Sequence, residues 1–184
     1  MLNILDTTFR SLGQFSEEEL NKLEKLLTPH NIEAGEALLK PGETCSTIHF
    51  ISLGAFYLYQ RNEELDKVVD ALFVEGDCLV DGLSFTSQKP TKYTMEAFVN
   101  STVYSLELND LHQLIEWSPK FFQLGKVLDP STNLPNLRNT PQQRYEELLA
   151  QYPTIIKIFP LKHIASFLRI TPETLSRIRK NISK

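Results

Sequence analysis

The C-terminal stretch of the chain carries charged residues at a spacing suited to nucleic-acid recognition. In "ITPETLSRIRKNISK", residues 170–184, Glu173, Arg177 and Lys180 follow one another at intervals of four and three residues, which places them on one face of a helix. The opposite face is apolar and consists of Leu175, Ile178 and Ile182. A carboxylate can accept a hydrogen bond from cytosine N4, and an arginine can donate to guanine O6 and N7. The charged face therefore has the chemistry that base reading in the DNA major groove requires.

The residue types also define where this helix begins. Thr171 is a favourable N-cap, Pro172 suits the first helical position, and Glu173 complements the helix dipole. The nearby hydroxyl side chains are candidates for contacts with bases or phosphates. The candidate DNA-binding residues are Thr171, Glu173, Thr174, Ser176, Arg177 and Lys180. The alternative is an ordinary solvent-exposed surface, which we favour for Lys184 and leave open for Thr174.

A second, shorter helix is expected directly before this one. "LKHIASFL" has apolar residues at helical spacing, and the next three residues, "RIT", are expected to form a turn. The two segments therefore make a helix-turn-helix candidate. From residue 161 to residue 184, six basic residues stand against one acidic residue, although the whole chain has a net charge of −4. A basic module on an acidic body fits nucleic-acid binding by that module.

The segment from Ile32 to Leu108 has the pattern of an antiparallel β-domain. It contains short runs rich in Val, Ile, Phe, Tyr and Thr, such as "TIHFISLG", "AFYLYQ" and "KVVDALF", which are separated by turn signals such as Gly76-Asp77. We expect a sandwich or barrel of about eight strands. Helices flank this domain: one follows Ser16, a natural N-cap, and one covers residues 109–118.

The best linker in the chain lies between the β-domain and the C-terminal module. "PKFFQLGKVL" can form a helix, but the following "DPSTNLPNLRNTP" carries three prolines and several turn-forming residues. Beyond the linker, four residues recur at helical spacing: Tyr145, Leu148, Leu149 and Tyr152. We therefore divide the chain into an N-terminal β-domain (1–118), a connector and candidate dimerisation segment (119–141), and a C-terminal helical module (142–184).

Composition and residue spacing exclude several classes of protein. The chain has 184 residues, 41% of them hydrophobic, which is enough to bury a core. It shows neither a signal-peptide pattern nor a membrane-spanning apolar stretch, so we expect a cytoplasmic protein. Cys45 and Cys78 are isolated, and the histidines lack H-x-H or HExxH spacing. No Ser/His/Asp arrangement can be assigned. We therefore expect neither an enzyme nor a metal or other cofactor.

Taken together, these motifs resemble those of the Crp/Fnr superfamily of bacterial transcription regulators, the relatives of the catabolite activator protein. "IASFLRITPETLSRIRK" is similar to the helix-turn-helix of that family, "LLKPGETCSTIHFISLGAFYLY" to its first β-roll segment, and "EGDCLVDGLSF" to the start of its ligand cassette. The resemblance implies an α+β chain. It would contain a cyclic-nucleotide-binding-like double-stranded β-helix (a jelly roll) with flanking helices, a dimerisation helix, and a small all-α helix-turn-helix module. By position, Glu173 and Arg177 fall on the base-reading residues of the family, and Pro172 replaces a polar contact residue.

The ligand cassette departs from the family pattern. Nucleotide-binding members have a glutamate for the ribose hydroxyl and an arginine for the cyclic phosphate, but here Asp81 stands at the first position and Lys92 or Thr91 at the second. Aspartate reaches less far, and lysine lacks the arginine fork, so cyclic AMP is not expected as a ligand. One alternative is another small anion, held by Lys92 and the backbone N–H groups after Asp81. The other, which we favour, is a barrel filled by Tyr93 without a ligand. The candidate ligand-binding residues are Asp81, Gly82, Leu83, Lys92, Tyr93 and Thr94.

Further departures concern the connector and the C-terminal module. Pro130 and Pro135 forbid the long dimer helix of the family, so the dimer helix is short, near residues 121–128, or the dimer is built otherwise. The sequence ends at Lys184, so we expect the module to lack a full β-hairpin wing, which should lower non-specific DNA affinity. Arg169 stands in the turn where glycine is usual, and a left-handed conformation there would cost about 1 kcal/mol or more.

We therefore expect a DNA-binding transcription regulator of Crp/Fnr type, acting as a homodimer on a near-palindromic site in double-stranded DNA. The half-site centres would lie about 34 Å apart, or a multiple of that distance. RNA polymerase is a further partner if the protein activates transcription, and no membrane partner is expected. The alternative is a protein-interaction or small-ligand sensor module of the same fold that no longer binds DNA.

Overall fold

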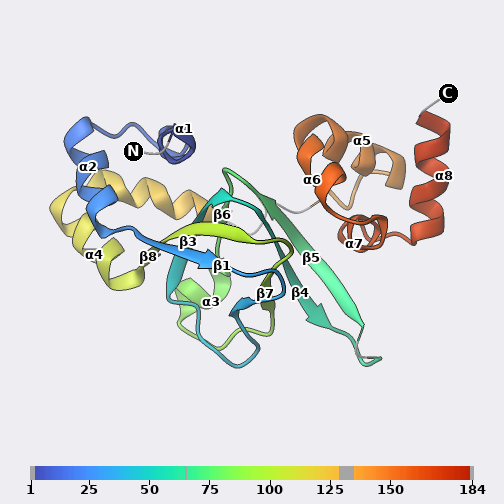
Figure 1. Ribbon diagram of the computed structural model, residues 1–184, viewed down its shortest axis with the longest axis horizontal. Coiled ribbons are helices and arrows are strands. Elements are labelled where there is room, and N and C mark those ends of the chain that lie inside the picture. Colours follow the sequence, from blue (N-terminus) through green and yellow to red (C-terminus); the bar gives the residue numbers. More distant parts are fainter. Residues whose placement is uncertain (1–2, 65, 129–134, 183–184) are drawn as a thin grey trace.

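The computed structural model describes residues 3–64, 66–128 and 135–182, and it has a central β-domain with helices at both ends (Figure 1). The strands are β1 (Thr28–Ile32), β2 (Ala37–Leu39), β3 (Thr47–Leu53), β4 (Ala55–Arg61), β5 (Lys67–Val74), β6 (Cys78–Leu79), β7 (Thr94–Ala97) and β8 (Ser101–Glu107). The helices are α1 (Asn3–Leu12), α2 (Glu17–Leu26), α3 (Gly82–Ser87), α4 (Leu108–Trp117), the 3-10 helix η1 (Pro119–Leu128), α5 (Pro141–Gln151), α6 (Pro153–Ile158), α7 (Leu161–Phe167) and α8 (Pro172–Ile182). Within these ranges, no helix is long and apolar enough to cross a membrane.

The strands form two antiparallel four-stranded sheets, with the orders β1-β8-β3-β6 and β2-β7-β4-β5. This arrangement confirms the predicted antiparallel sandwich of about eight strands. The chain passes from the first sheet to the second at Gly54, between β3 and β4, where φ is +109°. A side chain there would collide with Ser101, so both the backbone angle and the available space require glycine.

The helix predicted after Ser16 is present, and its first turn is closed by a capping box. Ser16 Oγ accepts a hydrogen bond from Glu19 N at 3.2 Å, and Glu19 Oε2 accepts one from Ser16 N at 2.7 Å. Glu19 Oε1 also accepts from Ser118 Oγ at 2.7 Å, which ties α2 to the end of α4. The bonds from Ser16 and Ser118 lower the pKa of Glu19 to about 2, so the carboxylate is charged and fixes both helices.

The first hydrophobic core fills the space between the two sheets and extends under α1, α2, α4 and η1. Its largest fully buried side chains include Phe9, Phe50, Phe56 and Phe121. In η1, Phe121 and Leu124 are both buried, because three residues per turn align positions i and i+3 on one side of a 3-10 helix. The helix expected at residues 119–128 is therefore present, but it is wound more tightly than an α-helix.

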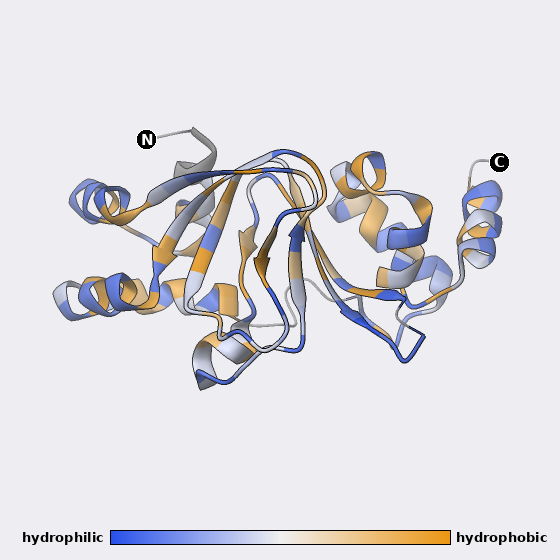
Figure 2. Ribbon diagram, turned by 60° about the horizontal axis from the view of Figure 1, so that its bottom comes forward, coloured by the Kyte–Doolittle hydropathy of each residue, from blue (hydrophilic) through white to orange (hydrophobic). Residues whose placement is uncertain are grey.

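A second hydrophobic core joins the outer face of β4 and β5 to the C-terminal helices. It contains Tyr57 and Leu72 from the strands, and Ile164, Leu168 and others from the helices. Figure 1 shows α7 next to β5 and α8 at the end of the molecule farthest from α2 and α4. Hydrophobic residues run along the strands and along the helices on both sides of them (Figure 2). The C-terminal helical module is therefore packed on the sheet.

Several elements differ from the sequence predictions. Helices α1, α3 and α6 were not anticipated. Short helices depend mainly on tertiary contacts for their stability, which the sequence pattern does not show. Leu149 and Ile182 were expected on buried helix faces, but both are exposed. Their helices, α5 and α8, are covered along narrower stripes, centred on Tyr145 and Leu148 in α5 and on Leu175 and Ile178 in α8. Pro130 and Lys184, on which two predictions rest, lie outside the described residues.

Candidate ligand cavity and nucleic-acid interface

A cavity of about 300 Å³ lies where the β-domain, η1 and the turn after α7 meet. Its lining residues are Leu58, Asp70, Ala71, Phe73, Cys78, Val80, Asp81, Gly82, Leu83, Tyr93, Val127, Leu128 and Arg169. Most of these side chains are apolar. The volume lies at the lower end of the range for small-molecule sites. Tyr93 therefore does not fill the barrel, because a cavity remains beside it.

Asp70 reaches the cavity because β5 contains a β-bulge. In the pairing of β4 with β5, Leu58 is opposite Ala71 and Tyr59 is opposite Val69, so Asp70 is the extra residue. Val69 packs in the outer core and Ala71 in the inner core. A bulge of this kind re-aims a side chain locally without disturbing the rest of the strand. The only sign of this residue in the sequence is a single acid in the apolar run "KVVDALFV".

Only one of the two carboxylate oxygens of Asp70 has a hydrogen-bond partner among the described residues. Its Oδ1 pairs with Nη2 of Arg169, from the turn between α7 and α8. Its Oδ2 is buried and has no hydrogen-bond partner among the described residues. A buried carboxylate oxygen without a donor is unfavourable by about 1–3 kcal/mol or more. The cavity therefore contains an acceptor that lacks its donor.

The backbone of Arg169 is in an unfavourable conformation at this position. Its φ is +57°, which is left-handed. Such a conformation costs about 1–2 kcal/mol for a residue with a side chain. Next to it, Ser166 Oγ accepts a hydrogen bond from Val69 N at 2.9 Å. The turn is thus fixed to β5 by an ion pair and a hydrogen bond, both at the bulge.

Asp81, predicted to contact a ligand, is used within the fold. Its Oδ1 accepts from Ser84 N at 3.2 Å and caps α3, and its Oδ2 accepts from Thr91 Oγ1 at 2.5 Å. The adjacent Gly82 lies directly against the backbone carbonyl of Leu128, where a side chain would collide. The end of η1 therefore covers the start of the cassette, and both oxygens of Asp81 are engaged.

The remaining candidate ligand residues divide between two places. Gly82, Leu83 and Tyr93 line the cavity with Asp81. Lys92 and Thr94 instead line an open hollow of about 880 Å³ on another part of the surface, and Lys92 Nζ lies 5.1 Å from the centroid of the Tyr93 ring. The lysine expected to bind an anion is therefore not in the cavity, although its neighbour Tyr93 is.

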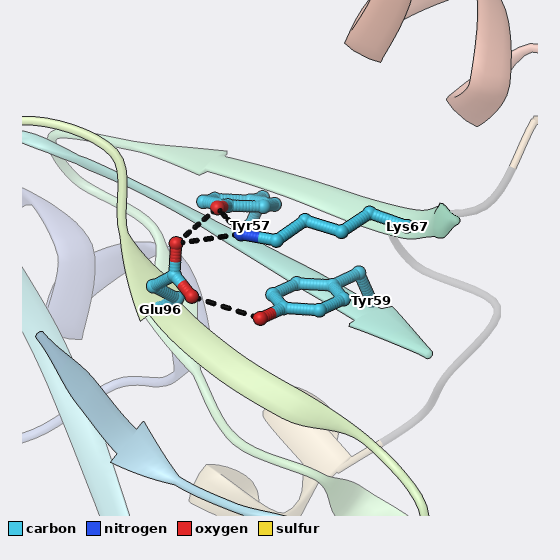
Figure 3. Close-up of polar contacts among 4 residues, drawn as sticks. All are labelled: Tyr57, Tyr59, Lys67 and Glu96. Atoms are coloured by element: carbon cyan, nitrogen blue, oxygen red, sulfur yellow. Dashed lines mark hydrogen bonds and ion pairs between the residues drawn. The ribbon is translucent and has the colours of Figure 1, made fainter. Parts of the chain in front are cut away.

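A polar cluster, defined by Tyr57, Tyr59, Lys67 and Glu96, lies on the outer face of the second sheet (Figure 3). Lys67 Nζ donates to Glu96 Oε1 at 2.9 Å and to Tyr57 Oη at 2.6 Å. Tyr59 Oη donates to Glu96 Oε2 at 2.8 Å, and Tyr57 Oη donates to Glu96 Oε1. Burial and the bond to Glu96 raise the pKa of Tyr57 to about 12. The cluster therefore ties β4, β5 and β7 together beside the helical module.

His163 connects this cluster to the helical module. Its ring stacks on Tyr57 with 5.2 Å between centroids and meets the edge of Phe98. Burial, together with the nearby Lys67 and Lys162, lowers the pKa of His163 below its ordinary value. The histidine is therefore held in its neutral form at the contact between α7 and β4. No group of three or more His, Cys, Asp or Glu side chains within residues 3–64, 66–128 and 135–182 could hold a metal ion.

The two helices predicted at the C-terminus are present as α7 and α8. Thr171 Oγ1 accepts from Thr174 N at 3.2 Å, as an N-cap does, and Pro172 is the first residue of α8. The bond from its own backbone N–H, the contact with Thr171 and the charge of Arg177 lower the pKa of Glu173. This carboxylate is charged at neutral pH.

The structure brings the candidate DNA-binding residues together on one surface. Glu173, Arg177 and Lys180 are exposed along α8, as is Thr171 at its start, while Thr174 and Ser176 are partly buried. Leu175 and Ile178 are buried on the opposite side. The basic and acidic side chains of α8 are thus presented to solvent, although the module is packed on the sheet.

Residues 29–117 match the family described as cyclic nucleotide-binding domain. The matched segment runs from β1 to the end of α4 and includes the strands that line the cavity. The chain thus contains a β-domain of the cyclic nucleotide-binding type, which confirms the coarse fold class expected from the sequence.

Solved structures of regulators in the Crp/Fnr family have a similar fold. FixK2 from Bradyrhizobium japonicum superposes with a TM-score of 0.67 at 16% identity, covering 85% of this chain and 84% of that chain. A mutant of CooA from Carboxydothermus hydrogenoformans gives 0.63 at 16% identity, covering 93% and 86%. The catabolite activator protein of Thermus thermophilus gives 0.56 at 14% identity, covering 92% and 84%. At these identities the likeness is one of fold.

One curated relative is also similar in sequence. Patatin-like phospholipase domain-containing protein 6 of Homo sapiens is 26% identical over 120 residues, which is 59% of this chain and 9% of that protein. The chain therefore spans less than a tenth of the length of this relative, and the match is a distant and partial one.

Proposed function

We propose that this protein is a transcription regulator of Crp/Fnr type that reads double-stranded DNA with α8. The observation that carries the proposal is the exposed face of Glu173, Arg177 and Lys180 on a capped helix whose other side is buried. Arg177 is suited to donate two hydrogen bonds to guanine, and Glu173 to accept one from cytosine. The similar fold of solved regulators in this family supports the same function.

In this proposal, α7 and α8 form a helix-turn-helix, with α7 crossing the DNA backbone. Thr171 and Lys180, at the two ends of the exposed face, would contact phosphates, and Thr174 and Ser176 would contact phosphates or bases at closer approach. Because the acidic body repels DNA, the basic module would supply the electrostatic attraction. We divide the chain for this purpose as in the sequence analysis: β-domain 1–118, connector 119–141 and DNA-binding module 142–184.

We also propose that the protein acts as a homodimer. Large apolar side chains are exposed on or next to η1, the segment that the resemblance assigns to dimerisation: Leu83, Trp117 and Phe122, the last of which is 68% exposed. We take these side chains as the candidate dimer contact, because apolar side chains that gather on a surface are typical of an interaction site. Two copies would present two α8 helices to half-sites about 34 Å apart, or a multiple of that distance.

The test is a selection from random duplex DNA with purified protein, followed by sequencing of the retained fragments. We expect enrichment of a two-fold symmetric site. Binding to that site should weaken about 10- to 100-fold in Arg177→Ala, since a bidentate contact to guanine contributes about 1–3 kcal/mol. Lys25→Ala is the matched control, because it removes one exposed positive charge on α2, far from α8. Equal binding by both variants, or no enrichment at any salt concentration, would overturn the proposal.

A second candidate function is that of a ligand sensor that does not read DNA. The observation that favours it is the cavity itself, which is lined by both the β-domain and the turn of the helical module. Thermal stabilisation by a small molecule, without sequence-selective retention of duplex DNA, would support this second function over the first.

A further inference from the structure

We propose that the cavity binds a small, uncharged, largely apolar molecule that donates one hydrogen bond to Asp70, and that the turn between α7 and α8 senses this ligand through Arg169. The ligand chemistry is argued from the cavity alone. The regulatory consequence rests on the proposed function, because it concerns the module assigned to DNA binding.

The need for a donor follows from Asp70. This residue lines the cavity, is 8% exposed, and has a buried Oδ2 without a partner among the described residues. Its other oxygen is occupied by Arg169. A hydroxyl or N–H group on a ligand would supply the missing hydrogen bond to a charged acceptor, which is among the stronger hydrogen bonds in proteins.

The charges around the cavity argue against an anion. Among the described residues that line it, Arg169 is the one cationic side chain, and it is already paired with Asp70. Asp81 is a second carboxylate in the lining, while Lys92 lies in the other hollow. A phosphate placed here would meet two carboxylates and no unpaired cation. A cationic ligand is also disfavoured, because Arg169 already neutralises Asp70 and both oxygens of Asp81 are engaged within the fold.

The remaining lining defines a compact apolar shape. Leu58, Phe73 and Val80 come from the β-domain, and Val127 and Leu128 close the cavity from η1. Burial and the neighbouring Asp77 raise the pKa of the Cys78 thiol to about 12, so this side chain is neutral as well. A volume of about 300 Å³ accepts a molecule of one or two rings.

The link to the helical module is direct. Asp70 offers Oδ2 to the ligand and Oδ1 to Arg169, so one carboxylate joins the cavity to the turn. The preceding residue, Val69, donates its N–H to Ser166 at the end of α7. A ligand that holds Asp70 in place therefore stabilises the docked turn, because the ion pair with this carboxylate adds to the bonds that Arg169 donates to Val69 O and Ser166 O.

The first experiment uses two matched probes, indole and indene, titrated into the full chain and followed by ligand-observed NMR. The probes have the same fused-ring shape, but only indole carries an N–H donor. We expect indole to bind the wild type about tenfold or more tightly than indene, because the hydrogen bond to a charged acceptor contributes this much. In Asp70→Asn, which removes the charge at nearly constant volume, the preference for indole should be lost.

Two further variants separate the chemistry from the packing. Ala71→Leu fills the cavity without touching the carboxylate and should abolish binding of both probes, whereas Ser166→Ala, which lies outside the lining, should leave the preference for indole. The midpoint of thermal unfolding identifies any variant that does not fold. Equal binding of indole and indene, no binding of either at millimolar concentration, or saturable binding of cyclic AMP that survives Asp70→Asn would each overturn the assigned ligand class.

The second experiment measures sensing without DNA. Hydrogen exchange of the amides in residues 161–170 is followed with and without saturating indole. In the wild type we expect exchange to slow at least threefold. In Arg169→Gly, measured at an indole concentration that saturates this variant, we expect no change. Slowing that persists in Arg169→Gly, or that is absent from the wild type at saturation, would overturn the role of Arg169. Because neither readout involves DNA, these failures are distinguishable from failure of the proposed DNA reading.

Discussion

Strands β1 and β4 belong to different sheets of the same sandwich and meet different surroundings. Along β1, four of the five residues are exposed and only Ile32 is buried. Along β4, the first five residues, Ala55 to Tyr59, are all buried. An antiparallel sheet of this kind usually buries one face and leaves the other to water. β4 departs from this rule because the helical module covers its outer face.

The difference shows that the second sheet separates two hydrophobic cores. Phe56 and Leu58 of β4 point into the β-domain, while Tyr57 and Tyr59 point to the helical module. The bulge at Asp70 lies in β5, the neighbouring strand of the same sheet. A change in the cavity therefore needs to cross only one layer of the structure to reach the module. At the β1 edge of the first sheet, by contrast, four of the five residues are exposed.

The largest effect on stability is expected from a substitution on the inner face of the second sheet. Phe56 is fully buried, and Phe56→Ala should lower the free energy of unfolding by about 3–5 kcal/mol through lost contacts and a residual cavity. Urea unfolding followed by circular dichroism measures this. The matched control is Leu53→Ala at the exposed end of β3, which should change stability by no more than about 0.5 kcal/mol. A similar loss in both variants would contradict the inner core described here.

A substitution in the outer core should lower the free energy of unfolding by less, and it should loosen only the helices near it. Leu168 is fully buried in the outer core, and Leu168→Ala should cost about 2–4 kcal/mol. Hydrogen exchange should show lost protection in α5 to α8, while β3 and β8 keep theirs. Leu149→Ala, on an exposed position of α5, is the control. Uniform loss of protection across both sheets would show that the two cores cannot be separated.

The polar cluster should contribute less than either core. Glu96→Gln removes the charge that accepts from Lys67, Tyr57 and Tyr59, and we expect a loss of about 1–3 kcal/mol. Burial raises the pKa of Tyr57 most and the hydrogen bond to Glu96 raises it further, so the same change should lower this pKa below about 12 while the effect of burial remains. Ultraviolet titration of tyrosine measures this. Glu116→Gln on exposed α4 should change neither quantity, and an unshifted tyrosine titration in Glu96→Gln would argue against the cluster.

The smallest effect is a pH dependence of stability that differs between His49 in the first sheet and His163 in α7, which packs on the second sheet. The pKa of His49 on β3 is lowered to about 4 by burial and by His30, and that of His163 is lowered by burial and by two lysines. The unfolded chain therefore takes up these protons first, and stability falls as the pH drops below about 6.5. For His49 the loss continues to about pH 4, at on the order of 1 kcal/mol per pH unit.

His49→Gln should therefore flatten the loss of stability between pH 7 and pH 5 more than His163→Gln does. Asp77 acts in the opposite direction, because burial raises its pKa to about 6 and its contribution grows as the pH falls toward 4. For this reason the measured quantity is the difference in slope between each variant and the wild type, from urea unfolding at both pH values. Equal slopes in all three proteins would contradict this prediction.

Much of the fold could be predicted from local patterns. The capped helix after Ser16, the helix that begins after Thr171 and the run of about eight strands each depend on neighbouring residues, and the structure confirms them. The short helices α1, α3 and α6 were missed, because contacts with distant residues stabilise them. The 3-10 winding of η1 was also missed, since the spacing of Phe121 and Leu124 fits both helix types.

The candidate sites show the same division. Glu173, Arg177 and Lys180 could be placed on one face because helical periodicity alone determines it. The sequence positions of Lys92 and Asp81 do not tell whether the two side chains share a site. The structure puts them at different hollows. Asp70 was overlooked, because its meaning depends on a bulge and on an arginine 99 positions later.

The sequence by itself determined the antiparallel sandwich, the start of α8 and its charged face, because each follows from residue spacing over a few turns or strands. Only the tertiary structure decided that β4 is buried on both faces, that Asp70 and Arg169 meet beside a cavity, and that a left-handed arginine is tolerated in the turn. The physical reason is that these features depend on which distant surfaces pack together. Burial, pairing and strain are properties of that packing, and no local pattern of residues encodes them.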